Sequence, residues 1–120
     1  MEEVFELLGK TAKAKTCKAM QGLIKEATEL MEKDADDAVM DAGLIAAAQK
    51  VEHYEIASYG TVSTWADLYG KEDAAELLQE TLGEETEADQ KLTALAENLV
   101  NPAAEEGKEE EEKTVISGRN

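Results

Sequence analysis

The sequence predicts a single all-α domain, and its length, its apolar residues and its turn signals all support this fold class. At 120 residues, the chain suits one hydrophobic core, since a domain usually takes roughly 100–200 residues. The hydrophobic fraction of 42% is built mainly from Ala and Leu, with one Phe and one Trp. This composition favours closely packed helices over a sheet, which would be rich in β-branched and aromatic residues.

The charge and the cysteine content limit the classes of partner. The formal net charge of -16 disfavours nucleic acid and anionic membrane lipid, because both bind to cationic surfaces, and favours metal cations. The single Cys17 cannot form an internal disulfide, and no signal peptide opens the chain. The longest apolar run, Ala42 to Ala48, is short of the roughly 18–20 residues that span a bilayer. We expect a soluble, cytoplasmic protein with no membrane contact.

A first, short helix is predicted at the N-terminus. Val4, Phe5, Leu7 and Leu8 have helical spacing, and Gly9 follows where a helix C-cap is expected. The segment has barely two turns and no N-cap, whereas globular helices commonly run to about 11–12 residues. We therefore expect that preceding sequence has been lost or cut away.

Three further helices are predicted, with stop signals between them. The segment from Met20 to Met31 has apolar residues at i, i+3, i+4 and i+7 and charged residues on the opposite face, which indicates a short amphipathic helix. A polar turn then supplies an N-cap aspartate to a long helix from about Asp37 to Tyr69, which Gly70 stops. A last helix runs from about Glu72 to Val100, and Asn101 and Pro102 end it. The two long helices form an antiparallel hairpin.

The chain divides into a helical domain over residues 1–100 and a tail over residues 101–120. The tail is dominated by glutamate and is low in apolar residues, so it cannot bury enough surface to offset the entropy of ordering. We expect an acidic, disordered and solubilising extension.

Acidic side chains occupy positions on the apolar stripes of both long helices. At about 100° per residue, Glu52 and Glu55 share a face with Ile45, Ala48 and Tyr59. On the last helix, the apolar line includes Leu78, Leu92 and Leu99. Glu85 lies at the centre of this line, with Asp89 one turn further on. A buried carboxylate costs several kcal/mol unless it is paired or binds a metal, and neither stripe supplies Lys or Arg.

These carboxylates predict a metal site, because di-iron proteins use Glu from facing helices and a ligand pair at i, i+3. Glu52 and Glu55 have that spacing, and Glu85 would face them. Asp89 is a further candidate ligand, or an acceptor that orients a ligand from outside the coordination sphere. The alternative is that some of these side chains lie at a bundle edge, where they reach water or a neighbour's lysines.

Three other residues are assigned structural roles. His53 projects about 100° away from Glu52, which favours a helix–helix or subunit contact over metal ligation. Tyr59 lies on the core line and either packs there or donates its hydroxyl to a carboxylate. Cys17 has no nearby His or second Cys, so no catalytic thiol is expected.

Three segments resemble the YciF-like branch of the ferritin-like superfamily over roughly Phe5 to Val100. They read CKAMQGLIKEA from Cys17, DAGLIAAAQKVEHYEIASYGT from Asp41 and AELLQETLGEETEADQKLTALA from Ala75. The resemblance implies a four-helix bundle, usually dimeric, that is associated with bacterial stress responses and holds a di-iron or mononuclear metal site. Here it would be represented by a short helix and a long antiparallel helical hairpin, because family members are longer at the N-terminus.

Two hypotheses of function follow. In the first, this is a ferritin-like stress protein that holds iron, or manganese, at Glu52, Glu55 and Glu85. A second chain of a homo-oligomer or the missing N-terminal helices would then supply the other ligands, and oxygen or peroxide would accept electrons in any redox reaction. In the second, the chain is a non-enzymatic helical stress protein that self-associates through its apolar faces without metal. The sequence does not decide whether the protein is an enzyme.

Overall fold

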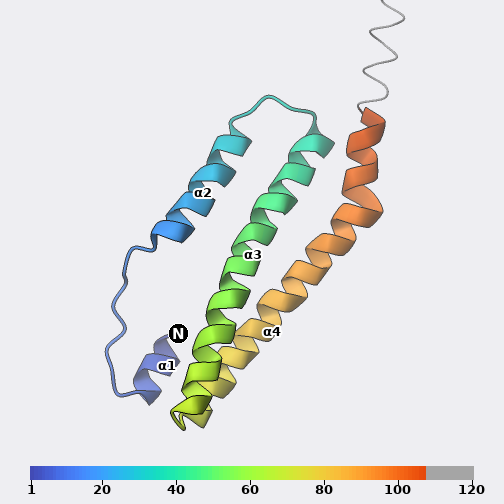
Figure 1. Cartoon of the computed structure of the whole chain (residues 1–120). Coiled ribbons are helices and arrows are strands. Elements are labelled where there is room, and N and C mark those ends of the chain that lie inside the picture. The colour runs from blue at the N-terminus through green and yellow to red at the C-terminus, as the bar shows by residue number, and fades with distance from the viewer. Residues whose placement is uncertain (108–120) are drawn as a thin grey trace, which may run out of the picture.

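The computed structural model describes residues 1–107, and every secondary-structure element in this range is a helix (Figure 1). The elements are α1 (Glu2–Leu7), α2 (Lys18–Met31), α3 (Asp37–Leu68), α4 (Glu72–Leu95) and a π-helical turn η1 (Ala96–Val100). No strand occurs within this range. The predicted all-α fold class, with a short helix and a long antiparallel hairpin, is therefore confirmed. Over the same residues, no helix is both long enough and apolar enough to cross a bilayer.

Glycines end the two helices for which the sequence predicts a glycine stop. Gly70 has a φ of 71°, a left-handed conformation that glycine adopts without steric cost. The amide of Lys71 donates to the carbonyl of Ala66 at 2.8 Å, and the amide of Gly70 donates to that of Asp67 at 3.0 Å, which is the Schellman pattern of helix termination. Gly9, with a φ of 67°, ends α1. The chain therefore reverses sharply at Gly70, and α4 returns along α3.

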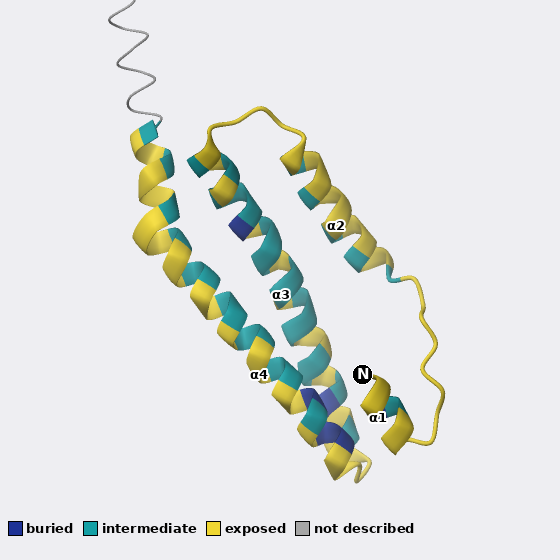
Figure 2. Cartoon of the chain, turned by 180° about the vertical axis from the view of Figure 1, so that it is seen from behind, coloured by how far each residue is buried: buried dark blue, intermediate teal, exposed yellow. Residues whose placement is uncertain are grey.

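The core lies at the closed end of the hairpin. Val4, Ala74 and Leu78 are buried there, and partly buried side chains surround them, namely Tyr59, Val62, Ala66 and Leu77. Figure 2 shows that the buried segments gather at this end and become sparse along the rest of the hairpin. Small residues allow the close approach of α3 and α4, because Ala75 is only 1% exposed and its carbonyl accepts from the Ser63 hydroxyl at 3.4 Å. The closed end therefore fixes the hairpin geometry.

Helix α2 lies along α3 on the side away from α4 (Figure 1). Its apolar face includes Leu30, and α3 presents Gly43 to that side chain. A Cβ atom on Gly43 would lie 2.9 Å from Leu30 Cδ2, so the glycine gives the leucine room to pack. The predicted short amphipathic helix is confirmed.

The open end of the hairpin differs from the sequence prediction at three residues. Leu99 was placed on the buried line, but it is 63% exposed, because the wider π-helical turn shifts the face on which following residues lie. The prediction that Asn101 and Pro102 end the helix was also wrong, since residues 101–107 continue in helical conformation. A wide turn just before a proline leaves room for its ring and accommodates its missing N–H. The rest of the predicted disordered tail, residues 108–120, lies outside the described residues.

Candidate metal centre

Three of the four predicted ligands come together between α3 and α4. One carboxylate oxygen each from Glu52, Glu55 and Glu85 can be chosen such that all three atoms lie within 4.8 Å of one another. The i, i+3 spacing places Glu52 and Glu55 on one face of α3, and α4 brings Glu85 opposite them. All three side chains are partly buried. The antiparallel hairpin thus builds a compact acidic cluster, which we call the carboxylate cluster.

No basic side chain balances this cluster within the described part of the chain. The ion pairs found among those residues are His53 with Asp89 and Lys91 with Glu87, and neither involves a member of the cluster. The two apolar stripes contain no Lys or Arg, so neither long helix supplies a basic partner from the face that carries the cluster. Three negative groups at this distance repel one another unless protons or a cation enter.

The close approach of the carboxyl groups raises the pKa values of two of them. The pKa of Glu52 is raised from 4.5 to about 7, first because its carboxyl shares a hydrogen bond with Glu85, then because it is buried, and then because Glu85, Glu55 and Asp89 are negative. That shared bond requires a proton on one of the two carboxyl groups. The pKa of Glu55 is also raised, chiefly by burial and then by Glu85. Glu52 and Glu55 therefore keep their protons to a higher pH than isolated carboxyl groups would.

One buried oxygen of the cluster has no hydrogen-bond partner within residues 1–107. It is Glu52 Oε2, whereas a buried acceptor normally finds a partner. An orphaned oxygen inside a ring of carboxylates is the arrangement that a bound cation would satisfy. The cluster supplies only oxygen donors, which suits the carboxylate-rich chemistry of di-iron and di-manganese sites in helix bundles. The residues present therefore fit a metal ion.

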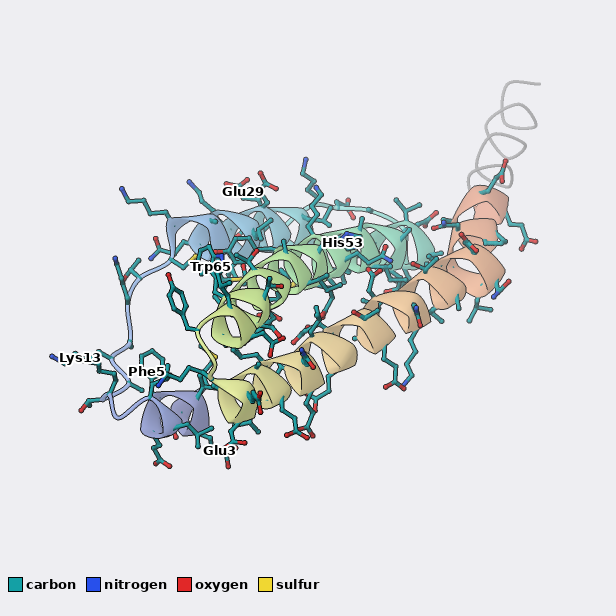
Figure 3. The ribbon with its side chains drawn as sticks, turned by 60° about the horizontal axis from the view of Figure 1, so that its bottom comes forward. Glu3, Phe5, Lys13, Glu29, His53 and Trp65 are labelled. Atoms are coloured by element: carbon teal, nitrogen blue, oxygen red, sulfur yellow. The ribbon has the colours of Figure 1, made fainter. Side chains whose placement is uncertain are left out.

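Asp89 lies outside the carboxylate cluster and joins a polar network between the helices. Its Oδ1 pairs with Nε2 of His53 at 3.0 Å and accepts from Nε2 of Gln49 at 3.3 Å. The same Gln49 nitrogen donates to Thr93 Oγ1 at 2.7 Å. His53, labelled in Figure 3, is thus in the helix–helix contact that the sequence favoured, with 68% of its side chain exposed. Direct ligation by Asp89 stays a prediction, and the structure places it where it would orient neighbouring groups.

The structure contains a contact between Cys17 and Tyr54 that the sequence analysis did not predict. The Cys17 Sγ and Tyr54 Oη atoms lie 3.0 Å apart, and the same sulfur accepts from the Met20 amide at 3.4 Å, which makes Cys17 the N-cap of α2. The pKa of the Cys17 thiol is lowered, first by the Tyr54 hydroxyl and then by the Met20 amide. The position of Cys17 directly before a periodic segment was a signal of capping, but sulfur is not among the favoured capping groups.

The sequence allows two roles for Tyr59, packing in the core or donating its hydroxyl to a carboxylate. The structure shows the packing role. It packs against the core group of Val4, Ala74 and Leu78. Burial and the nearby negative charges of Glu55 and Glu85 raise the pKa of its hydroxyl. Tyr59 therefore packs against the core and lies near the carboxylates of Glu55 and Glu85.

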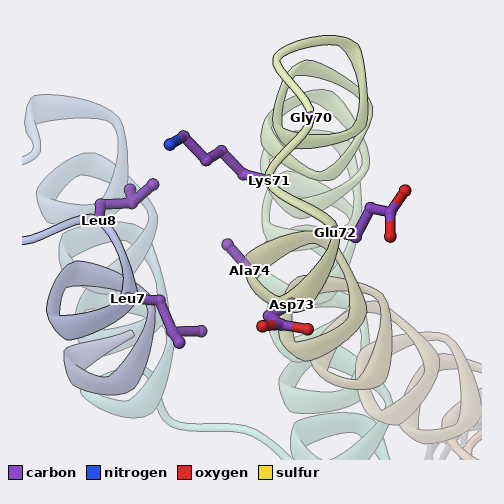
Figure 4. Close-up of a pocket in the computed structure, with 7 residues that line it drawn as sticks. All are labelled: Leu7, Leu8, Gly70, Lys71, Glu72, Asp73 and Ala74. Carbon is purple, nitrogen blue, oxygen red and sulfur yellow. The ribbon is translucent and has the colours of Figure 1, made fainter.

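A separate hollow of about 250 Å³ lies between α1 and the start of α4. Figure 4 shows Leu7 and Leu8 on one side, and Lys71 and Asp73 on the other. The hollow contains no group of three metal-ligating side chains, because the one such group within residues 1–107 is the carboxylate cluster. The candidate site is therefore the cluster and not the hollow.

Fold and cluster together define an all-α protein of the helix-bundle class with an acidic centre between two antiparallel helices. A family model described as "Domain of unknown function (DUF892)" matches residues 1–105, and the chain belongs to this family. The chain is 61% identical over 89 residues to Protein YciF of Escherichia coli (strain K12). This alignment covers 74% of this chain and 54% of that protein. The chain thus spans about half the length of the curated relative it matches.

Two solved structures have the same fold. The crystal structure of the E. coli stress protein YciF matches with a TM-score of 0.78 and 54% identity, over 83% of this chain and 64% of the other. YcfI from Rhodopseudomonas palustris matches with a TM-score of 0.74 and 46% identity, over 77% of this chain and 59% of the other. The resemblance to the YciF-like family is confirmed, and the helical fold is consistent with the ferritin-like superfamily.

Proposed function

We propose that this chain is the metal-holding part of a ferritin-like bundle that binds iron through Glu52, Glu55 and Glu85. The observation that carries the proposal is the buried, unpartnered Glu52 Oε2 within a cluster of three carboxylates that no basic side chain in the described residues neutralises. A divalent cation removes the repulsion and supplies the missing partner in one step. Manganese is the second metal that this donor set suits.

The proposal assigns a role to each part of the site. Glu52 and Glu55 hold the metal from one helix and Glu85 holds it from the other, so the cation would tie α3 to α4. Asp89 would fix the positions of His53 and Gln49 beside the cluster. Bound iron would supply one-electron chemistry with oxygen or peroxide, and the protein's part would be positioning and electrostatic tuning. The E. coli relative is called a stress protein, and we propose a stress-related role in the cytoplasm for this chain.

We further propose that ligands from outside the described hairpin complete the site. Three carboxylates leave coordination positions free on the metals that bind in such bundles, which use Glu from four helices. Within the described chain, α1 covers only the closed end of the hairpin, and α2 packs on α3. A second copy in a homo-oligomer, or further helices of a longer protein, would supply the remaining groups.

An anaerobic titration with Fe(II) tests the proposal. The wild-type chain should take up iron in a fixed ratio, and Glu52→Ala and Glu85→Ala should each weaken uptake by roughly tenfold or more, as expected when a group near a metal is lost. Glu84→Ala is the matched control, because Glu84 is exposed on the same helix. Circular dichroism checks that each variant keeps its helices. Equal uptake by all four proteins would end the proposal.

A second candidate function is self-association without metal. It is favoured by large apolar side chains that remain exposed, among them Trp65 at 58%, Leu68 at 75% and Tyr69 at 76%. Exposed apolar area of this kind marks contact surfaces. Elemental analysis combined with sedimentation separates the two functions. A stoichiometric metal supports the first, whereas a metal-free oligomer supports the second and a metal-free compact monomer contradicts both.

A further inference from the structure

The positive charges of this acidic protein are concentrated in one segment. Between Leu7 and Lys25 the chain has five of its 12 Lys and Arg residues, whereas all 28 Asp and Glu residues lie elsewhere. Four of these lysines, at positions 10, 13, 15 and 18, fall within nine residues. We call residues 10–18 the lysine strap. The whole protein has a net charge of -16, so its overall electrostatic potential is negative. The lysine strap is positively charged and makes the potential locally positive.

The lysine strap is exposed and fixed at both ends. It connects α1 to α2, and its residues are exposed apart from Cys17. Figure 3 shows Lys13 projecting away from the helices. At one end the Lys10 amide donates to the Phe5 carbonyl at 2.9 Å, and at the other the Cys17 sulfur lies 3.0 Å from the Tyr54 hydroxyl. A segment held in this way loses less conformational entropy on binding than a free loop does.

None of the strap lysines is in an ion pair within residues 1–107. The two ion pairs in that range are His53 with Asp89 and Lys91 with Glu87. Four ammonium groups are thus presented to solvent together. The strap has the charge and the exposure of a docking site for an acidic surface.

An acidic surface of matching length lies on α4. Exposed glutamates follow one another along this helix at steps of three or four residues, which places them on one side of it; they are Glu72, Glu76, Glu80, Glu84 and Glu87. We call these five residues the acidic stripe. At 1.5 Å per residue the stripe is about 22 Å long, and the strap spans at most about 26 Å when extended. The two charged surfaces therefore match in length and are opposite in sign.

The strap runs from α1 to α2 on the side of α3 away from α4, and only its start, just after Leu8, comes near the first residues of α4 (Figures 1 and 2). A full-length contact between them therefore requires two molecules. We propose that the lysine strap docks onto the acidic stripe of a second copy of this chain. The contact differs from the metal-bridged assembly proposed above, because it uses neither the carboxylate cluster nor a metal.

The physical chemistry of the contact makes it sensitive to salt. Single exposed ion pairs contribute little, so the association depends on several pairs that form at once. At physiological ionic strength the Debye length is about 8 Å, and repulsion between the distant acidic parts of two copies is largely screened. Pairs in direct contact are screened less. More salt then weakens the contact pairs themselves and separates the copies.

Sedimentation velocity of the full chain, with a chelator present, is the first test. We expect reversible association at about 0.1 M salt and at least roughly tenfold weaker association at about 0.5 M salt, where the Debye length is shorter. A protein that stays monomeric up to high concentration at the lower salt overturns the proposal. An association that salt does not weaken overturns it as well.

Charge reversal and mixing give the decisive test. Lys13→Glu/Lys15→Glu and Glu76→Lys/Glu80→Lys should each be monomeric alone, and an equimolar mixture should associate again, because the reversed strap of one variant fits the reversed stripe of the other. Lys33→Glu/Lys50→Glu and Glu26→Lys/Glu29→Lys are matched controls that change the net charge equally at exposed positions on other surfaces. The controls should associate as the wild type does.

The remaining outcomes all count against the proposal. Association of the charge-reversed variants alone, or no recovery on mixing, shows that the strap and the stripe do not meet. A labelled DNA duplex serves as the probe for a different partner. If the wild-type chain is monomeric and binds the duplex through the strap, the strap is a site for polyanions and the proposal is wrong.

Discussion

Glu52 combines burial, crowding and an unpartnered oxygen in one side chain. Its pKa of about 7 means that the folded chain holds the protonated form more tightly than the unfolded chain does, since the ordinary value is 4.5. The resulting stability is fully present below pH 4.5 and is lost as the pH rises through 7. In the metal-free protein above pH 7, the ionised Glu52 therefore opposes folding.

Glu52→Gln should reverse this penalty. The variant keeps the shape of the side chain but cannot ionise, so we expect metal-free protein at pH 8 to gain about 1–2 kcal/mol of stability, which is less than the full shift would give because the site is partly solvated. The gain should disappear towards pH 4.5. Urea unfolding with a chelator at both pH values measures it. A gain of the same size at both values, or at Glu84→Gln, would contradict the account.

Tyr54 controls the thiol of Cys17. The hydroxyl at 3.0 Å is the largest cause of the lowered pKa of that thiol, and a thiolate is the reactive form. Tyr54→Phe should therefore raise the pKa of Cys17 and slow its alkylation by iodoacetamide at pH 7 to 8. The pH profile of the alkylation rate provides the measurement. Thr61→Ala, which removes an exposed hydroxyl bonded to the Ala57 carbonyl on the same helix, is the control, and an unchanged profile for Tyr54→Phe would refute the role of the hydroxyl.

At the scale of elements, the pairing of α3 with α4 relies on a polar contact as well as on the apolar core. Gln49 reaches across to Thr93 at 2.7 Å and to Asp89 at 3.3 Å, beyond the region where Ala74 and Leu78 are buried. Gln49→Ala should lower the free energy of unfolding by about 1 kcal/mol, the usual net contribution of such hydrogen bonds. Denaturant unfolding measures the change. The exposed Gln21 on α2 gives the control Gln21→Ala, and equal losses in both variants would contradict this assignment.

The elements that the sequence predicted correctly are those with local signals. Gly9 and Gly70 were recognised as stops because a left-handed residue after a helix favours glycine. The periodic apolar residues gave α2, α3 and most of α4. The π-helical turn was not predictable, because no local signal distinguishes an i+5 turn from an α-turn before Pro102, and Leu99 was consequently placed on the wrong face.

In the candidate site, too, the residues with a local signal were predicted and the contacts that depend on the tertiary fold were not. Glu52, Glu55 and Glu85 were found because charged residues on an apolar stripe stand out against a helical period. The pairing of Cys17 with Tyr54 joins residues 37 positions apart and depends on how α2 packs on α3. The bond from Gln49 to Thr93 likewise requires the register of the hairpin. Tertiary contacts of this kind have no signature in a single sequence.

The whole molecule is a hairpin with a small core at one end. Among the described residues, no large side chain is less than 2% exposed, and the middle of the hairpin, where the carboxylate cluster lies, is only partly buried. A ligand that binds the folded state alone stabilises it by mass action. We therefore expect Fe(II) or Mn(II) to raise the unfolding temperature of the wild type by several degrees, and to leave that of Glu52→Ala/Glu85→Ala unchanged. Differential scanning calorimetry measures the shift, and equal shifts in both proteins would show that the metal binds elsewhere.

The central claim is that the three carboxylates between α3 and α4 hold a metal. A crystal structure of the iron-loaded protein, with anomalous data collected at the iron absorption edge, tests this claim most directly. The account predicts an anomalous peak within bonding distance of Glu52, Glu55 and Glu85, with Glu52 Oε2 as one of the ligands. An iron-loaded crystal without a peak at these oxygens, or with iron bound only at other acidic residues, would contradict it.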